Sequence, residues 1–355
     1  MALLFFNLPF FTDFCFVKIL VIQTAFIGDA ILATSVLEQL HRHIPAVELH
    51  LLVRKGNETL FDNHPFLQQV WVWKKKKNKM LHLFRLAWDI RRQRFDVIIN
   101  LHRYASSGFI TAISGATKRI GFGKNPFACC YTQSVPHSIS ADVAHSMHET
   151  ERYQLLIEAF TGKAVGRPVL YPAATDRQFV HAFQSVPYVC LAPASVWFTK
   201  QWPLHKWVDL CNALPADYSI YLLGAPADRL RCEQIRQSAQ QPQRIRILCG
   251  ELSFLQSAAL MQGAAMNFVN DSAPLHLASA TNAPVTAIFC STVPAFGFGP
   301  LSDTHFIIET PEALPCRPCG LHGKAACPQQ HFHCAETITA EAVMAPWLQQ
   351  RLHMR

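Results

Sequence analysis

The sequence has few charged residues and no uninterrupted apolar run long enough to cross a membrane. Asp, Glu, Lys and Arg make up 16% of its 355 residues, whereas apolar residues make up 50%. A disordered chain has little apolar content and a large net charge, so this composition excludes disorder and indicates a globular protein. At about 150 residues per domain, the length favours two domains.

The first 22 residues are apolar but lack the features of an export signal. No Lys or Arg precedes Lys18, and Asn7, Pro9 and Asp13 interrupt the apolar run. A signal peptide needs a basic segment before its apolar core, and a spanning helix needs about 20 apolar residues. Residues 1–16 are therefore interpreted as an extension that touches a membrane surface or that results from a misassigned start codon. The protein is expected to be cytoplasmic, where thiols stay reduced.

The sequence also lacks the glycine-rich signature of dinucleotide-binding enzymes. An apolar, β-branched run at residues 18–24 predicts a buried strand, and helical spacing follows over residues 30–42. The loop between them contains one glycine, Gly28, instead of the three of the G-x-G-x-x-G pattern. This disfavours a nicotinamide or flavin dehydrogenase.

Strand-like and helix-like segments alternate in both halves of the chain. Further strands are predicted at residues 47–53, 96–101, 188–192, 218–223, 244–248, 266–269 and 285–289, and further helices at 207–214, 228–237, 254–262, 274–280 and 340–352. This alternation predicts parallel sheets and an α/β fold. Pro168, Pro172 and Pro187 mark an interdomain linker. Ligands of such sheets bind at the carboxyl ends of strands, so the loops there are the candidate sites.

Two of these loops lead into helices. Asp29 follows the first strand beside Gly28, which permits a tight turn, and it is either a helix cap or a functional carboxylate. Asp271 and Ser272 follow a later strand, and His276 lies about one turn into the next helix. A helix N-terminus attracts anions, so this second loop is a natural diphosphate site, with an ordinary capped helix as the alternative.

Two further loops carry side chains suited to a nucleotide. Lys200 follows the strand at residues 188–192 in a loop that also contains Ser195. A lysine there can neutralise a phosphate, although most surface lysines do not. Asp228 follows a strand and a glycine turn, and it either binds ribose hydroxyls or caps a helix.

Five segments in this order resemble one family. They are residues 27–29 (IGD), 98–102 (IINLH) with 119–122 (RIGF), 200–203 (KQWP), 223–226 (LGAP) and 270–278 (NDSAPLHLA). Together they resemble glycosyltransferase family nine, the lipopolysaccharide heptosyltransferases, from residue 18 to the terminal helix. The resemblance implies the GT-B architecture, in which two Rossmann-like, doubly wound parallel-sheet domains face each other across a cleft.

The resemblance also implies domain boundaries and an activity. It implies an acceptor-binding domain at residues 17–167, a linker at 168–187, a nucleotide-sugar-binding domain at 188–337, and a terminal helix at 338–355 that packs back on the first domain. Members of the family transfer a sugar, typically heptose from an ADP-linked donor, to an anionic lipopolysaccharide acceptor with inversion and without a required metal or cofactor.

Individual roles are carried over from the family to matching positions. Asp29 matches the general base and Lys200 the residue that neutralises the leaving diphosphate. Asp271 matches the sugar-binding aspartate, and Asp228 an acidic ribose ligand. The remaining donor contacts implied are Ser195, Ser272, Ala273, Pro274, Leu275 and His276.

The chain departs from the family pattern at two places. Ala273 replaces the glycine of the D-S-G-P motif, which reduces backbone freedom beside the phosphate. Residues 105–107 (ASS) replace a segment that often has a basic residue, so His102 and Arg103 are the expected acceptor contacts.

The net charge of +8 has one conspicuous source in a lysine tract at residues 74–79. Such a tract is either a solvated surface or a site for anions, and Lys74 and Lys75 are candidate acceptor contacts. Attraction to phosphorylated lipid would place the enzyme peripherally at the inner membrane, and the neighbouring Trp71 and Trp73 suit an interface. The modest excess does not require nucleic acid.

Four of the twelve cysteines fall within 19 residues. They are Cys316, Cys319, Cys327 and Cys334. A C-x2-C pair is typical of zinc sites, so the segment predicts either a structural zinc or reduced thiols. Three functions stay open: heptose transfer, transfer from another nucleotide sugar, or an inactive assembly protein that binds nucleotide sugars.

Overall fold

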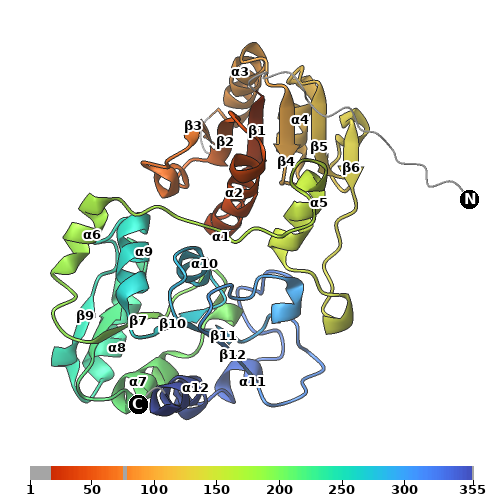
Figure 1. Ribbon diagram of the computed structural model, residues 1–355. Coiled ribbons are helices and arrows are strands. Elements are labelled where there is room, and N and C mark those ends of the chain that lie inside the picture. The colour runs from red at the N-terminus through yellow and green to blue at the C-terminus, as the bar shows by residue number, and fades with distance from the viewer. Residues whose placement is uncertain (1–16, 75–77, 354–355) are drawn as a thin grey trace, which may run out of the picture.

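The structure, a computed structural model, describes residues 17–74 and 78–353, which form two parallel β-sheets with helices packed against them (Figure 1). The first half has a six-stranded sheet in the order β3-β2-β1-β4-β5-β6, and the second half has one in the order β12-β11-β10-β7-β8-β9. Counted within each half, both sheets have the order 3-2-1-4-5-6 of dinucleotide-binding folds. The predicted pair of doubly wound sheets is therefore confirmed.

The elements of the first half alternate as the sequence predicts. Its strands are β1 (Lys18–Gln23), β2 (Glu48–Arg54), β3 (Leu67–Trp73), β4 (Val97–Asn100), β5 (Lys118–Phe122) and β6 (Gln133–Val135). Its helices are α1 (Ile27–Leu32), α2 (Thr34–His43), α3 (Lys79–Arg92), α4 (Ala105–Ile113) and α5 (Glu149–Thr161). The helix predicted over residues 30–42 is thus two helices, which meet at Ala33.

The second half repeats this alternation. Its strands are β7 (Tyr188–Ala192), β8 (Ser219–Leu222), β9 (Ile245–Ile247), β10 (Asn267–Asn270), β11 (Val285–Phe289) and β12 (His305–Glu309). Its helices are α6 (Ala174–His181), α7 (Leu204–Ala213), α8 (Arg229–Ser238), α9 (Phe254–Gly263), α10 (Ala273–Ala280), α11 (His333–Glu336) and α12 (Ala340–His353). Within the described residues, no helix combines the length and apolar content needed to cross a bilayer.

Buried strands contribute side chains to both faces of each sheet. In β1, Ile19 and Val21 join one apolar cluster, whereas Leu20 and Ile22 join another. The cluster that contains Ile19 extends into the second half, where it includes Val269 of β10. One continuous core therefore joins the two halves.

The predicted linker at residues 168–187 contains a helix. Its residues 174–181 form α6, which packs against α9 of the second half. At the start of the segment, the backbone N–H of Leu170 donates to the carbonyl oxygen of Ala280. Much of the segment is thus part of the second half rather than a free connection.

The resemblance implies that the terminal helix packs back on the first domain, but α12 packs on the second half instead. It contacts α7, β11 and β12 of the second half, beside which it lies in Figure 1. Val343 and Trp347 are buried in the second half's core, and the Trp347 ring packs edge-on against Tyr218 and Phe268. The apolar side of α12 is complementary to this core, which fixes the helix there.

A buried guanidinium connects the two halves near the start of α5. Arg152 donates from Nε to the Glu149 carboxylate at 2.6 Å and from Nη2 to the carbonyl oxygen of Phe296 in the second half at 2.5 Å. The N–H of Glu149 also donates to the carbonyl oxygen of Gly297. A side chain at Gly297 would meet the carbonyl oxygen of Met147, so glycine is required at this close approach. We call this group the α5 clasp.

We expect Arg152→Met to destabilise the protein by about 3–5 kcal/mol, because it leaves the buried Glu149 carboxylate without its cation. The matched control is Arg167→Met, since Arg167 and Asp303 form a pair that is 62% exposed on both sides. That change should cost less than about 1 kcal/mol. Urea unfolding of both variants measures the difference, and equal losses would contradict the clasp.

Candidate active site

A cleft of about 430 Å³ lies at the carboxyl edge of the first sheet. Its lining comes from the ends of β1, β2 and β3, from the loops after β1 and β4, from the starts of α1, α3, α4 and α5, and from one residue of the second half, His322. Ligands of doubly wound sheets bind at this edge, where the winding reverses between β1 and β4. The residues that line it are Gln23, Thr24, Ala25, Phe26, Asp29, Arg54, Trp73, Lys79, Leu101, His102, Arg103, Tyr104, Ala105, Ser106, Glu149 and His322.

Asp29 lies in the first turn of α1 and lines the cleft. Its carboxylate accepts a hydrogen bond from the N–H of Phe26, so it also caps the helix. Burial raises the pKa of Asp29 to about 6, and the negative charge of Glu149 adds to this effect, whereas Arg103 opposes it. A carboxylate with such a pKa can accept a proton near neutral pH.

Glu149 is a cleft residue that the sequence did not reveal. Burial alone would raise its pKa, but contacts with His137 and Arg152 outweigh burial and lower the pKa to about 2. Glu149 is therefore ionised at neutral pH and supplies a fixed negative charge near Asp29. It is the first residue of α5, and only the fold brings it to the loop after β1.

The N-terminus of α10 lies directly against α1. A Cβ atom at Gly28 would stand 2.6 Å from Cδ2 of His276, so the imidazole occupies the space beside this glycine. Gly28 lies inside α1, so this close approach explains it rather than the tight turn predicted from the sequence. Because His276 lies in the first turns of α10, the start of that helix packs against α1, the helix that carries Asp29.

His276 is a buried, neutral imidazole. Burial lowers its pKa to about 4, and the neighbouring Lys200 lowers it further, whereas Asp271 opposes the shift. Its Nδ1 atom has no hydrogen-bond partner among the described residues. A neutral imidazole can donate one hydrogen bond to a ligand, and a buried nitrogen without a partner favours binding of a polar group.

Lys200 and Asp271 form an ion pair across the loops after β7 and β10. Nζ of Lys200 lies 2.6 Å from Oδ2 of Asp271, which also accepts a hydrogen bond from Thr292. Asp271 is buried and Lys200 is 15% exposed at its side chain. Ser272 precedes the first turn of α10, which contains Ala273, Pro274 and Leu275. Lys200 and Asp271, which were predicted from separate loops, thus come together where the winding of the second sheet reverses between β7 and β10.

His322 connects the cleft around Asp29 with the Lys200–Asp271 pair. It comes from the cysteine-rich segment of the second half and lines the cleft that contains Asp29. Burial lowers the pKa of His322, and so do the charges of Lys200 and Arg103, whereas Asp271 opposes them. These couplings place the Lys200–Asp271 pair and Arg103 around one imidazole. Residue spacing gave no signal that His322 would reach the cleft.

Basic residues line the first-half side of the cleft. Arg54 and Lys79 join the predicted Arg103, and burial lowers the pKa of Arg54 while Asp29 opposes that shift. The predicted His102 is also present, and its Nδ1 lies 3.0 Å from the hydroxyl of Thr24. Lys74 is exposed and does not contribute to the lining, and Lys75 lies outside the described residues.

Two predicted donor residues make local contacts only. The carboxylate of Asp228 accepts a hydrogen bond from the N–H of Ala225, which is the helix-cap alternative. The carbonyl oxygen of Ser195 accepts from Gln201, and this contact shapes the loop that leads to Lys200. Neither residue lines the cleft described above.

The tryptophans beside the lysine tract do not form an exposed pair. Trp73 is buried, and the half-buried Trp71 donates from its indole nitrogen to Nδ1 of His50. Both belong to β3, an edge strand of the first sheet. The interpretation of Trp73 as a membrane-interface residue is wrong, because its side chain is buried.

The four clustered cysteines are free thiols in this structure. Sγ of Cys316 lies 3.8 Å from Nε2 of His331, and Cys334 is buried. Burial raises the pKa of Cys334 to about 12, and the neighbouring Cys319 adds to the effect. Within the part of the chain that the structure describes, no three Cys, His, Asp or Glu side chains are arranged to hold a metal ion.

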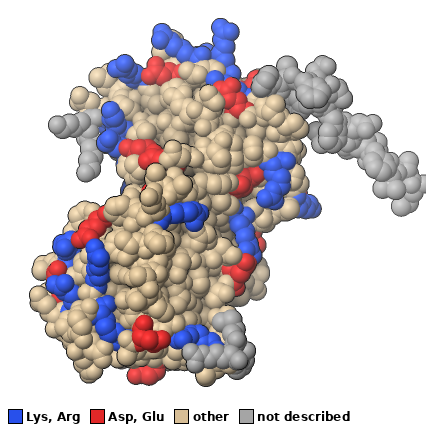
Figure 2. Space-filling view, turned by 60° about the vertical axis from the view of Figure 1, so that its left-hand side comes forward, with Lys and Arg blue, Asp and Glu red and all other residues tan. Residues whose placement is uncertain are grey.

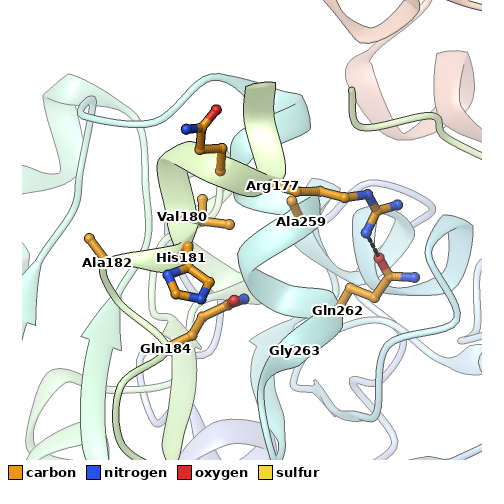
Figure 3. Close-up of a pocket in the computed structure, with 9 residues that line it drawn as sticks. Arg177, Val180, His181, Ala182, Gln184, Ala259, Gln262 and Gly263 are labelled. Carbon is orange, nitrogen blue, oxygen red and sulfur yellow. Dashed lines mark hydrogen bonds between the residues drawn. The ribbon is translucent and has the colours of Figure 1, made fainter. Parts of the chain in front are cut away.

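A second pocket, of about 650 Å³, lies between α6 and α9 (Figure 3). Its one charged lining residue, Arg177, donates to the side-chain oxygen of Gln262 at 2.7 Å. None of the described residues that line it is acidic, and His181 is the one imidazole among them. The cleft at Asp29 is therefore the better candidate for catalysis.

The two doubly wound sheets define the GT-B architecture, and comparison with known proteins specifies the family. Residues 83–326 match the model of glycosyltransferase family 9, described as heptosyltransferase. The chain belongs to this family. It is 25% identical over 280 residues to lipopolysaccharide heptosyltransferase 3 of Escherichia coli, an alignment that covers 75% of this chain and 82% of that relative.

Two solved structures have the same fold. A family 9 glycosyltransferase from Veillonella parvula superposes with a TM-score of 0.78 at 18% identity and covers 94% of this chain and 97% of its own. The ADP-heptose lipopolysaccharide heptosyltransferase II of E. coli gives a TM-score of 0.73 at 20% identity, with 94% and 100% covered. The GT-B architecture that the sequence resemblance implied is confirmed.

The Asp29 carboxyl should titrate with a midpoint near pH 6, above the range of an exposed aspartate, because it is buried beside Glu149. Replacing Arg103 with Gln removes a positive charge and should move the midpoint to higher pH. The side-chain carbon resonances of ¹³C-labelled aspartate report the titration.

The control for this titration is Arg236→Gln, an exposed position on α8 that should leave the midpoint unchanged. A midpoint near that of a free aspartate would show that Asp29 is solvated and not buried in the cleft.

Proposed function

We propose that this protein is an inverting glycosyltransferase that transfers heptose from ADP-heptose to an anionic lipopolysaccharide core acceptor. One observation carries the proposal: the Asp29 carboxylate, with its pKa raised to about 6, lies on the helix whose Gly28 contacts His276 at the start of α10. A proton acceptor and an anion-binding helix N-terminus are thus adjacent. Transfer of a sugar from a diphosphate to a hydroxyl needs both.

Asp29 acts as the general base. As the acceptor oxygen attacks the anomeric carbon, its proton passes to the Asp29 carboxylate, and the bond between that carbon and the phosphate oxygen breaks. Attack opposite the leaving group inverts the configuration at the anomeric carbon. A base with a pKa near the working pH is ionised often enough to accept the proton and basic enough to hold it.

The start of α10 and Lys200 receive the leaving diphosphate. Charge accumulates on its oxygens as the bond breaks, and the unpaired N–H groups of a helix N-terminus stabilise anions. Lys200 is held in place by its 2.6 Å ion pair with Asp271 and adds a positive charge. The neutral His276 donates a hydrogen bond. Such preorganised groups stabilise the transition state more than the ground state.

Other predicted contacts complete the two binding sites. On the donor side, Asp271 binds a sugar hydroxyl and Asp228 and Ser195 bind the nucleoside. On the acceptor side, Arg54, Lys79 and Arg103 line the cleft and favour an anionic glycolipid. The acceptor's lipid places the reaction at the inner surface of the cytoplasmic membrane.

The donor assignment is supported by the names of similar proteins. The relative at 25% identity is described as a lipopolysaccharide heptosyltransferase, and one structure of the same fold as an ADP-heptose enzyme. Two alternatives are a transferase for another nucleotide sugar and an inactive protein that binds nucleotide sugars for assembly. The raised pKa of Asp29 favours a catalytic protein, because binding alone does not need a basic carboxylate.

We expect Asp29→Asn to lower kcat by about 10²- to 10⁴-fold, since it removes the proton acceptor. Affinity for ADP should be unchanged, because the donor contacts lie on the second half. The measurements are transfer of heptose from ADP-heptose to a heptose-deficient lipopolysaccharide and calorimetric titration with ADP.

Asp142→Asn is the matched control for this variant, because Asp142 is exposed and bonds only locally, to Ala144 and His145, among the contacts described. Transfer by Asp29→Asn at the wild-type rate would show that Asp29 is not the general base. Turnover of UDP-sugars but not of ADP-heptose by the wild type would show that the donor is a UDP-sugar instead of ADP-heptose. Binding of ADP without turnover of any donor would indicate the assembly protein.

The cysteine segment keeps two interpretations, a structural zinc and reduced thiols. Four thiolates are a suitable donor set for zinc, although the described side chains are not gathered around one point. Neither interpretation changes the catalytic proposal. Metal analysis of protein purified without added zinc distinguishes them, and less than about half an equivalent would refute a constitutive zinc site.

A further inference from the structure

Helix α3 has apolar side chains on two sides. Its inward side chains are buried against the first sheet, and they are Leu83, Leu86, Ala87 and Ile90. Its outward side chains are 57%, 70%, 51% and 54% exposed, and they are Met80, Leu81, Phe84 and Trp88. A helix of a globular domain needs only the inward set. The outward set has no part in the core of the fold.

The outward residues form a continuous stripe. Met80, Phe84 and Trp88 follow one another at intervals of four, and Leu81 lies three residues before Phe84, so all four share one face of the helix. The ring of Phe84 packs edge-on against Phe109 of α4, which fixes this part of the stripe. Single exposed apolar residues are common, whereas a contiguous stripe marks an interaction site.

Basic side chains border the stripe. Helix α3 carries Lys79, Arg85, Arg91 and Arg92 but one acidic residue, Asp89. The guanidinium of Arg92 lies 5.8 Å from the Trp88 ring, and Arg91 is tethered to the carbonyl oxygen of Ile113. Figure 2 shows Lys and Arg side chains gathered at the upper end of the molecule, where α3 lies in Figure 1. This charge complements an anionic surface.

The position of α3 connects the stripe to the cleft. Lys79, the first residue of the helix, lines the cleft that contains Asp29. The stripe therefore starts at the edge of the cleft and runs away from it along the outer side of the first half. A substrate whose lipid remains in a bilayer can reach the cleft only if this part of the protein comes close to the membrane.

We propose that the outward face of α3, defined by Met80, Leu81, Phe84 and Trp88 with Arg85 and Arg92, docks on an anionic lipid bilayer. The apolar stripe enters the boundary between headgroups and acyl chains, the arginines contact lipid phosphates, and Trp88 lies at the level of the headgroups. The orientation presents the cleft to a glycolipid in the same leaflet. The link to a glycolipid rests on the proposed function, whereas bilayer binding does not.

The experiment measures sedimentation of the full chain with vesicles of phosphatidylethanolamine and phosphatidylglycerol, without any substrate. Replacing Leu81, Phe84 and Trp88 with Ser should lower the partition coefficient at least about tenfold. Arg85→Gln with Arg92→Gln should lower it by about fivefold for each charge, and more weakly at high salt. All other residues stay as they are in every variant.

The matched control is Phe179→Ser with Leu230→Ser, which removes exposed apolar side chains from α6 and α8 of the second half. This variant should bind vesicles like the wild type. Circular dichroism and thermal unfolding check that each variant folds, and quenching of Trp88 by brominated lipid, with Trp88→Phe as its blank, reports insertion without relying on the serine variants.

Three results would overturn the proposal: vesicle binding by the serine variant at the wild-type level, equal binding to phosphatidylcholine vesicles, or no quenching of Trp88. Sedimentation velocity tests the alternative occupant, a second copy of the chain. Self-association that the serine variant abolishes, together with absence of vesicle binding, would assign the face to a dimer. Loss of vesicle binding with transfer to a detergent-solubilised acceptor intact would leave the proposed function standing.

Discussion

The buried Arg152 guanidinium fixes the relation between the two halves, and the cleft depends on that relation. It neutralises Glu149 at the start of α5 and donates to a carbonyl oxygen of the second half. Glu149 in turn faces the cleft, where its charge helps to raise the pKa of Asp29. The same contact thus links the two halves and holds in place a carboxylate that adds to the effect of burial on the pKa of Asp29.

The cleft separates charge between its two sides. The first half supplies the Asp29 carboxylate, whose pKa is raised, and the second supplies a helix N-terminus and Lys200, which stabilise negative charge. In the transfer proposed above, a proton moves toward the first half while electrons move toward the second. Both sheets have the same strand order, so each has a switch point at the carboxyl ends of its strands. Packing of α1 against α10 brings the helices that follow β1 and β10 together.

Sequence patterns predicted secondary structure and the loop residues next to it, but they did not predict which distant residues the fold brings together. The alternation of segments gave both sheets, and the loops after β1, β7 and β10 gave Asp29, Lys200 and Asp271, because a residue that follows a strand stays at that strand's end. Glu149 and His322 lie far along the chain from Asp29, and no spacing rule connects them. The terminal helix was misplaced because its partner was taken from the family resemblance, whereas its apolar side chains pack in the second half. Trp73 was interpreted as an interface residue from its basic neighbours, which do not determine its burial.

The contact between Gly28 and His276 links two positions that are almost 250 residues apart. Because the imidazole occupies the space where a Cβ atom at position 28 would lie, the volumes of these two residues cannot vary independently. Among homologous chains, a side chain larger than glycine at position 28 would require a smaller residue at position 276 or a wider separation of the halves. Sequence covariation between these positions would therefore record how tightly the cleft is closed in each member of the family.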